Sequence, residues 1–136
     1  MFLILGTVFG LVAVVLGAFG SHALRAKLTA ERAAFFETGV RYQMWHTFAL
    51  FAVVLLGSIR FVSPSGGTVE FTIFEVTFGW PALLAGWMSV AGIVLFSGSL
   101  YALTLSERRG WCAVTPIGGV CLVLGWSALV LEAWVS

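Results

Sequence analysis

The sequence is poor in the residues that soluble proteins use to meet water. Its 136 residues include no Asp, no Asn and a single Gln, and only 10% are charged, whereas soluble domains usually carry about 25% charged residues. A chain with so few charges cannot cover itself with a hydrated surface. Its net charge of +1 also leaves no basic patch of the kind that contacts nucleic acid. The composition therefore excludes an ordinary soluble domain and indicates an integral membrane protein.

Cysteine is equally scarce. The two cysteines, Cys112 and Cys121, lie nine positions apart, so on one helix they point in roughly opposite directions and cannot form a disulfide within it. We expect both to be buried apolar side chains. No other ligands stand at a metal-binding spacing, so the sequence predicts neither a metal site nor a cofactor.

The lack of Asp also weakens any catalytic reading. A Ser–His pair would have no Asp to orient the imidazole, and no Ser lies in a G-x-S-x-G turn. No glycine-rich loop leads into a helix with the Lys that a phosphate site requires. We therefore expect a protein that is not an enzyme.

Apolar residues are what the chain has in abundance. Hydrophobic residues make up 60% of the sequence, and the mean hydropathy is +1.06. Apolar runs of about 20 residues mark membrane-spanning helices, and four are present, at about 2–20, 42–59, 81–105 and 111–134. The first lacks the preceding Lys or Arg of a signal peptide, so we expect it to be retained. The sequence predicts an all-α bundle of four transmembrane helices forming one membrane domain, residues 1–136.

The positive charges indicate the orientation of these helices. The loop 24–41 contains four Lys or Arg residues and the turn 106–110 contains two, whereas the opposite side contains only Arg60. Lys and Arg accumulate in cytoplasmic loops. We therefore predict a multi-pass protein of the cell (inner) membrane, with the loops 24–41 and 106–110 in the cytoplasm and both termini on the outer side.

Two connecting segments have features of their own. Within the loop 24–41, the sequence predicts a short amphipathic helix, capped by Thr29 and with Glu31 in its first turn. The outer loop 60–80 combines a Pro-Ser-Gly-Gly turn with aromatic and β-branched residues, and it fits an interfacial segment or a short hairpin. An aromatic segment at an interface is also a candidate docking surface.

Small residues predict where helices pack. One line along the first helix, the small-residue stripe, collects Gly6, Gly10, Ala13, Gly17 and Gly20. Small residues let membrane helices approach closely, so the stripe is expected to face another helix of the same chain or a second subunit. Gly118 and Gly119 suggest a lesser contact on the fourth helix, where Pro116 predicts a loosened turn near Cys112.

Polar side chains gather at the inner ends of the predicted helices. The candidate cluster consists of His22, Arg41, Tyr42, His46, Ser97, Ser99, Tyr101 and Thr115. Tyr42 and His46 share one side of their helix, whereas His22 joins the cluster only if the first helix unwinds at Gly20. The cluster is either a polar vestibule open to the cytoplasm or a set of interfacial anchors and interhelical hydrogen bonds.

Four segments carry a resemblance to a known family: "LGAFGSHAL", "FETGVRYQMWHTFAL", "AGIVLFSGSLYALTL" and "VTPIGGVCLVLGW". Their order and spacing resemble those of the small four-helix inner-membrane proteins of the YgdD/YwdK type. The resemblance implies a four-helix membrane protein without an established activity, and it implies that the polar residues above belong to the family pattern. The loop 60–80 departs from that pattern, because it is longer than the family's usual connection.

Three functions fit the sequence. The favoured one is a structural or accessory subunit that packs with itself or with a larger membrane complex, because small-residue contacts are many and catalytic groups few. The second is a small carrier or channel-like protein whose inner vestibule is built around His46, with Arg41 as a second selectivity group. The third is a lipid- or quinone-binding membrane enzyme at the inner leaflet. In each case the lipid bilayer is the surrounding partner.

Overall fold

A computed structural model describes residues 1–24, 26–58, 78–106 and 108–135, and this part of the chain contains helices and no strand. The elements are α1 (Phe2–Phe19), the π-helix η1 (Gly20–Leu24), α2 (Ala30–Ser58), α3 (Trp80–Gly92), the π-helix η2 (Ile93–Ser97), α4 (Gly98–Ser106), the 3₁₀-helix η3 (Arg109–Ala113) and α5 (Val114–Val135). The all-α prediction is therefore confirmed for the described residues.

Consecutive helical elements join into longer rods, and three of these rods are long and apolar enough to cross a membrane. They are α1, the continuous run of α3, η2 and α4 from Trp80 to Ser106, and the run Gly110–Val135 of η3 and α5. Large apolar side chains on their outer faces are exposed, among them Leu11 on α1 and Val130 on α5. Such a surface suits a lipid environment rather than water.

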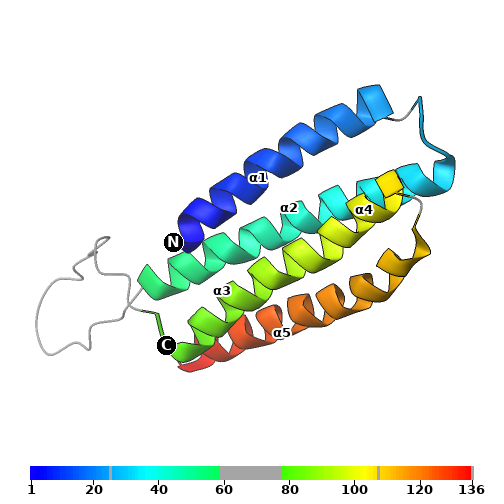
Figure 1. The fold of residues 1–136 in the computed structure, drawn as a ribbon. Coiled ribbons are helices and arrows are strands. Elements are labelled where there is room, and N and C mark those ends of the chain that lie inside the picture. Colours follow the sequence, from blue (N-terminus) through cyan, green and yellow to red (C-terminus); the bar gives the residue numbers. More distant parts are fainter. Residues whose placement is uncertain (25, 59–77, 107, 136) are drawn as a thin grey trace, which may run out of the picture.

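The rods run antiparallel, and Figure 1 shows both termini at the same end of the bundle. α1 packs mainly on α2, α5 packs on α3 and η2, and α2 lies between them in contact with α3, α4 and α5. Phe2 is 1% exposed and inserts against Gly86 of α3. The apolar core surrounds this residue, at the end of the bundle that carries the termini.

The small-residue stripe of α1 faces α2 of the same chain. A Cβ atom added at Gly6 would lie 2.8 Å from the ring of Phe51, and one at Gly17 would lie 3.5 Å from Val40. Ala13, between them, is buried. The sequence leaves two partners for the stripe, another helix of the same chain or a second subunit, and the structure shows a helix of the same chain in contact with it.

The predicted short helix in the loop 24–41 is not a separate element. Its residues form the first turns of α2, which continues without a break from Ala30 to Ser58. Thr29 caps this helix as predicted, because its Oγ1 accepts a hydrogen bond from the Arg32 amide at 3.4 Å. No proline interrupts the segment, and Gly39 lies where the Tyr101 ring packs against the backbone.

The remaining sequence predictions can also be placed. The loosened turn before Pro116 is present as η3, and Pro116 lies in the first turn of α5, where a missing N–H breaks no helical hydrogen bond. Cys112 is exposed in this turn, so its predicted burial is wrong: the turn lies at the end of the bundle, where few side chains cover it. The alternatives for the loop 60–80 concern residues that lie largely outside the described ranges.

Candidate functional site

The polar side chains divide into separate groups instead of forming one cluster. The first group is centred on Gln43, which is 3% exposed. Its Oε1 accepts a hydrogen bond from the Tyr101 hydroxyl at 2.9 Å, and its Nε2 donates to the Phe9 carbonyl at 2.8 Å. One side chain therefore ties α2 to both α1 and α4.

The second group joins α4 to α5. The hydroxyls of Ser99 and Thr115 are hydrogen-bonded to each other at 2.8 Å, and the Ser99 hydroxyl also lies 2.9 Å from the Phe96 carbonyl. Nearby, Ser97 is 1% exposed, and its Oγ is without a hydrogen-bond partner in the described part of the chain. Ser97 and Ser99 therefore differ in role although they stand two positions apart.

The third group is built around His46, which is 6% exposed. Its Nδ1 lies 2.7 Å from the Tyr42 carbonyl oxygen. Because a carbonyl can only accept, Nδ1 carries the proton, and the neutral ring then offers a lone pair at Nε2. The imidazole stacks on the Tyr42 ring and meets the edge of Trp126, with centroid distances of 5.9 and 6.3 Å. The described hydrogen bonds of His46 do not include Ser97 or Tyr101, which the sequence places in the same candidate cluster.

His46 lines a groove on one side of the bundle, which we call the α2–α5 groove. It has a volume of about 760 Å³, and its floor contains Tyr42, His46 and Phe96. Residues of α5 from Pro116 to Val130 form its long wall, which corresponds to about 21 Å of helix. Among the described residues, Nε2 of His46 has no hydrogen-bond partner.

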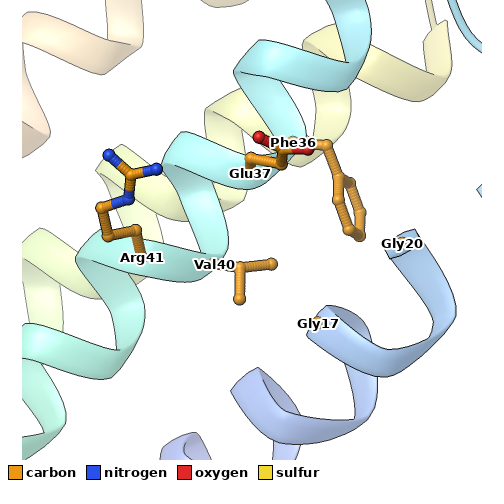
Figure 2. A pocket seen from close by; sticks show the side chains of 6 residues that line it. All are labelled: Gly17, Gly20, Phe36, Glu37, Val40 and Arg41. Atoms are coloured by element: carbon orange, nitrogen blue, oxygen red, sulfur yellow. The ribbon is translucent and has the colours of Figure 1, made fainter. Parts of the chain in front are cut away.

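His22 and Arg41 lie apart from these groups. α1 does not unwind at Gly20 but continues as the π-helix η1, and this leaves His22 exposed beyond the end of α1. Arg41 is exposed, and it borders the seam between α1 and α2. It lines two adjoining hollows of about 340 and 420 Å³, which share Gly17, Val40 and Arg41. Figure 2 shows the first of these, with the Phe36 ring directed at Gly20 across the seam.

Five of the described buried polar residues were absent from the predicted cluster: Gln43, Thr47, Ser89, Thr104 and Glu132. Gln43 is the only Gln of the chain, and that rarity inside an apolar helix was the signal for it. Glu132 is 7% exposed, and its Oε2 accepts a hydrogen bond from the Ala82 amide at 3.2 Å, at the start of α3. A carboxylate near a helix N-terminus is favoured by the helix dipole. Glu132 therefore ties the end of α5 to the beginning of α3.

The chemistry that these groups offer is hydrogen bonding between helices. Gln43, Ser99, Thr115 and Glu132 are each engaged by a partner on another element. Within the described ranges, no three His, Cys, Asp or Glu side chains lie together as a metal site would require. Within the α2–α5 groove, Nε2 of His46 is a polar atom that these contacts leave available.

The chain is similar to a set of bacterial membrane proteins. Residues 16–119 match the family described as "Protein of unknown function (DUF423)". The UPF0382 membrane protein YwdK of Bacillus subtilis (strain 168) is 41% identical over 133 residues, which cover 98% of this chain and 95% of that protein. The UPF0382 inner membrane protein YgdD of Escherichia coli (strain K12) is 34% identical over 131 residues, covering 96% and 87%. No solved structure matches the chain.

Proposed function

Because this chain belongs to the DUF423 family of membrane proteins, we propose its function from its own geometry: a non-enzymatic accessory subunit of a membrane assembly. It lies in the bilayer as a multi-pass protein. By analogy with the name of its Escherichia coli relative, the membrane is the inner membrane. The partner in the assembly is another membrane protein that docks on the α2–α5 groove.

The proposal includes a fourth membrane crossing, made by α2. The end of α1 and the start of α3 lie at opposite ends of the bundle, and α2 runs between them (Figure 1). If α1 and the rod of α3, η2 and α4 both cross the bilayer, α2 must cross it too. Its polar residues Arg41, Gln43 and His46 lower its hydropathy without shortening it. Four crossings agree with the placement of both termini at one end.

The observation that carries the proposal is the position of His46. Polar groups at membrane depth are costly to leave exposed to lipid, and Nε2 of this residue is left with a free lone pair beside the groove. Among the other buried polar side chains, Gln43, Ser99 and Glu132 are hydrogen-bonded to another element of the bundle. Gln43 and Tyr101 are hydrogen-bonded to each other between helices and so do not line a polar path. This supports an accessory role over a carrier.

The shape of the groove favours a helix as its occupant. The wall formed by α5 extends for about four turns, which matches a helix packed alongside it. Gly119 lines the groove, and small residues allow close approach of a second backbone. A Ser, Thr, Asn or Gln side chain on the incoming helix would donate its hydrogen bond to Nε2 of His46.

Photo-crosslinking from the groove tests the proposal. A photoreactive amino acid replaces Val123, which lines the groove, or Leu11, which lies on the outer face of α1; their side chains are 65% and 66% exposed. We expect membranes that contain the Val123 probe to yield one defined protein adduct, whereas the matched Leu11 probe yields only lipid adducts.

A groove-filling variant, Gly119→Leu, should abolish the Val123 adduct and leave the protein folded. An adduct with a second copy of this chain would reassign the groove to self-association. Lipid adducts alone from both positions would overturn the accessory role.

A further inference from the structure

We propose that the seam between α1 and α2 binds one aminophospholipid. Its phosphate lies on Arg41, its ammonium group faces Glu37, and one acyl chain lies along the seam toward Phe48. This site is separate from the α2–α5 groove, and it does not depend on the proposed accessory role.

The seam is hollow on both sides of Arg41. The hollow nearer the end of the bundle is lined by Gly20, Phe36 and Glu37. The deeper hollow is lined by Trp45 and Phe48. Both are also bordered by Gly17, Val40 and Arg41. Gly17 contributes no side chain, and Val40 lies 3.5 Å from where its Cβ would be. α1 packs mainly on α2, and the two hollows lie at this contact.

The level of Arg41 suits a phosphate. Val40 lies opposite Gly17, and the apolar helix α1 ends at Phe19, so Arg41 stands within a turn of the end of the span. Glu37 lies about 6 Å from Arg41 along α2 toward the water at this end of the bundle, and Phe48 lies about 10 Å from Arg41 toward the membrane centre. The order carboxylate, guanidinium, apolar trough is the order in which a lipid presents its amine, phosphate and acyl chain from water inward.

The charges complement a zwitterionic headgroup. Glu37 and Arg41 are both exposed, and within the described residues neither is ion-paired. Both lie on α2 in Figure 2, where Val40 stands between Arg41 and Gly17. A guanidinium binds phosphate through two parallel hydrogen bonds, and a primary ammonium donates to a carboxylate. Phosphatidylglycerol has an uncharged glycerol in place of the ammonium group that would face Glu37, and a choline headgroup has no N–H to donate.

The acyl chain accounts for the deeper hollow. Its lining is apolar apart from Arg41. Trp45 and Phe48 are 63% and 55% exposed, so their rings stand at the edge of the trough, where they can cover a chain that lies in it. Contact with an alkyl chain along this length gives many small dispersion gains.

Native mass spectrometry in mild detergent tests the site. The purified full-length protein is titrated with phosphatidylethanolamine, phosphatidylglycerol and phosphatidylcholine of identical acyl chains. We expect one phosphatidylethanolamine to bind about tenfold more tightly than either of the others, as one charge-assisted contact would give.

The variants separate the two halves of the headgroup. Arg41→Gln should weaken phosphatidylethanolamine binding about tenfold, and Glu37→Gln should remove the preference over phosphatidylglycerol. The control Arg108→Gln, at an exposed arginine of the other connection at the same end of the bundle, should change neither. Val14→Trp, which fills the deeper hollow, should weaken all three lipids equally.

The thermal unfolding midpoint of each variant is measured as well, and binding is compared only among variants whose midpoints agree, so that loss of fold is not mistaken for loss of binding. Equal affinity for the three lipids in the unmodified protein would overturn the proposal. So would equal binding to the Arg41→Gln and Arg108→Gln variants. Neither result would affect the crosslinking test of the α2–α5 groove.

Discussion

At the scale of single residues, the bundle uses its few polar side chains as connectors. Gln43 is the clearest example, because its side-chain amide makes hydrogen bonds to two other helices. Its partners are the Tyr101 hydroxyl and the Phe9 carbonyl. Inside the bilayer, a polar group without a protein partner cannot form a hydrogen bond to water instead. Each connector therefore restricts the helices to an arrangement that satisfies it.

Replacing Gln43 should reveal this connection. Gln43→Leu removes both hydrogen bonds and leaves the Tyr101 hydroxyl without its acceptor, so we expect the free energy of unfolding to fall by about 1–3 kcal/mol. Tyr101→Phe alone should cost less. In a double-mutant cycle in detergent, the two changes together should cost less than their sum by about 0.6–1.7 kcal/mol. Strict additivity would show that the hydrogen bond contributes nothing.

Ser97 and Ser99 give a matched pair of substitutions. Ser97 has a buried hydroxyl without a partner in the described residues, so Ser97→Ala should leave stability unchanged or raise it by about 1 kcal/mol. Ser99 bonds to Thr115, so Ser99→Ala should lower stability by about 0.6–1.7 kcal/mol. Thermal unfolding of the two variants in the same detergent checks the contrast. A larger loss from Ser97→Ala would mean that its hydroxyl has a partner, such as a water molecule.

Sequence reasoning identified most of these polar residues but not their pairing. Loop charges and helix ends predicted that they would lie at one end of the helices. The rotation of each helix about its own axis decides which side chain meets which, and that depends on packing across the whole bundle. For this reason the sequence groups His46 with Ser97 and Tyr101 in one cluster, whereas its ring contacts are Tyr42 and Trp126.

At the scale of elements, glycine positions set how closely the rods approach. Gly118 of α5 lies against the backbone of Phe96 in η2, and a Cβ atom there would overlap main-chain atoms. At Gly119 the added Cβ would meet only the Phe96 ring, at 3.8 Å. Two adjacent glycines therefore have different roles, and only the first is required for the contact between α5 and η2.

Alanine substitutions at these two glycines should differ sharply. Gly118→Ala must push α5 away from η2, and overpacking of this kind costs about 1–3 kcal/mol. Gly119→Ala should be neutral, or slightly stabilising through its better helix propensity. Melting temperatures measured in one detergent compare the variants. Equal melting temperatures for both would contradict the close contact at Gly118.

Glu132 makes a second contact between elements, from α5 to the first turn of α3. Glu132→Ala leaves the buried Ala82 amide without this acceptor, so we expect a loss of about 1–3 kcal/mol in the free energy of unfolding. Glu132→Gln keeps an acceptor oxygen and should retain most of the stability. Chemical unfolding monitored by circular dichroism measures both. A Gln variant as unstable as the Ala variant would assign the effect to the charge at the helix N-terminus.

The elements themselves were largely predictable from apolar runs. The predicted spans 2–20, 81–105 and 111–134 agree closely with the helices observed. The second span differs, because the polar residues before it predict a boundary at residue 42. A polar stretch without proline can continue a helix beyond the membrane, and α2 does so from Ala30. The π-helices η1 and η2 had no sequence signal, since an extra residue in a turn is a response to packing.

At the scale of the whole molecule, the antiparallel order of rods constrains the topology. α2 has 29 residues and is about 43 Å long, whereas the hydrocarbon core is about 30 Å thick. Its first turns therefore extend beyond the core, and the remainder is long enough to cross it. With Lys and Arg concentrated in the connections on the Ala30 side, that side is expected to be cytoplasmic.

Reporter fusions test this topology and the crossing by α2 together. A phosphatase that folds only outside the cytoplasm is fused after Leu28, Ser58, Arg108 or Ser136. We expect activity from the fusions at Ser58 and Ser136 and none from those at Leu28 and Arg108, with green fluorescent protein fusions giving the opposite pattern. The first pair of positions brackets α2, so equal activity at Leu28 and Ser58 would mean that α2 does not cross. The reverse pattern at all four positions would keep four crossings but invert the protein, and the positive residues around Arg41 would then face outward.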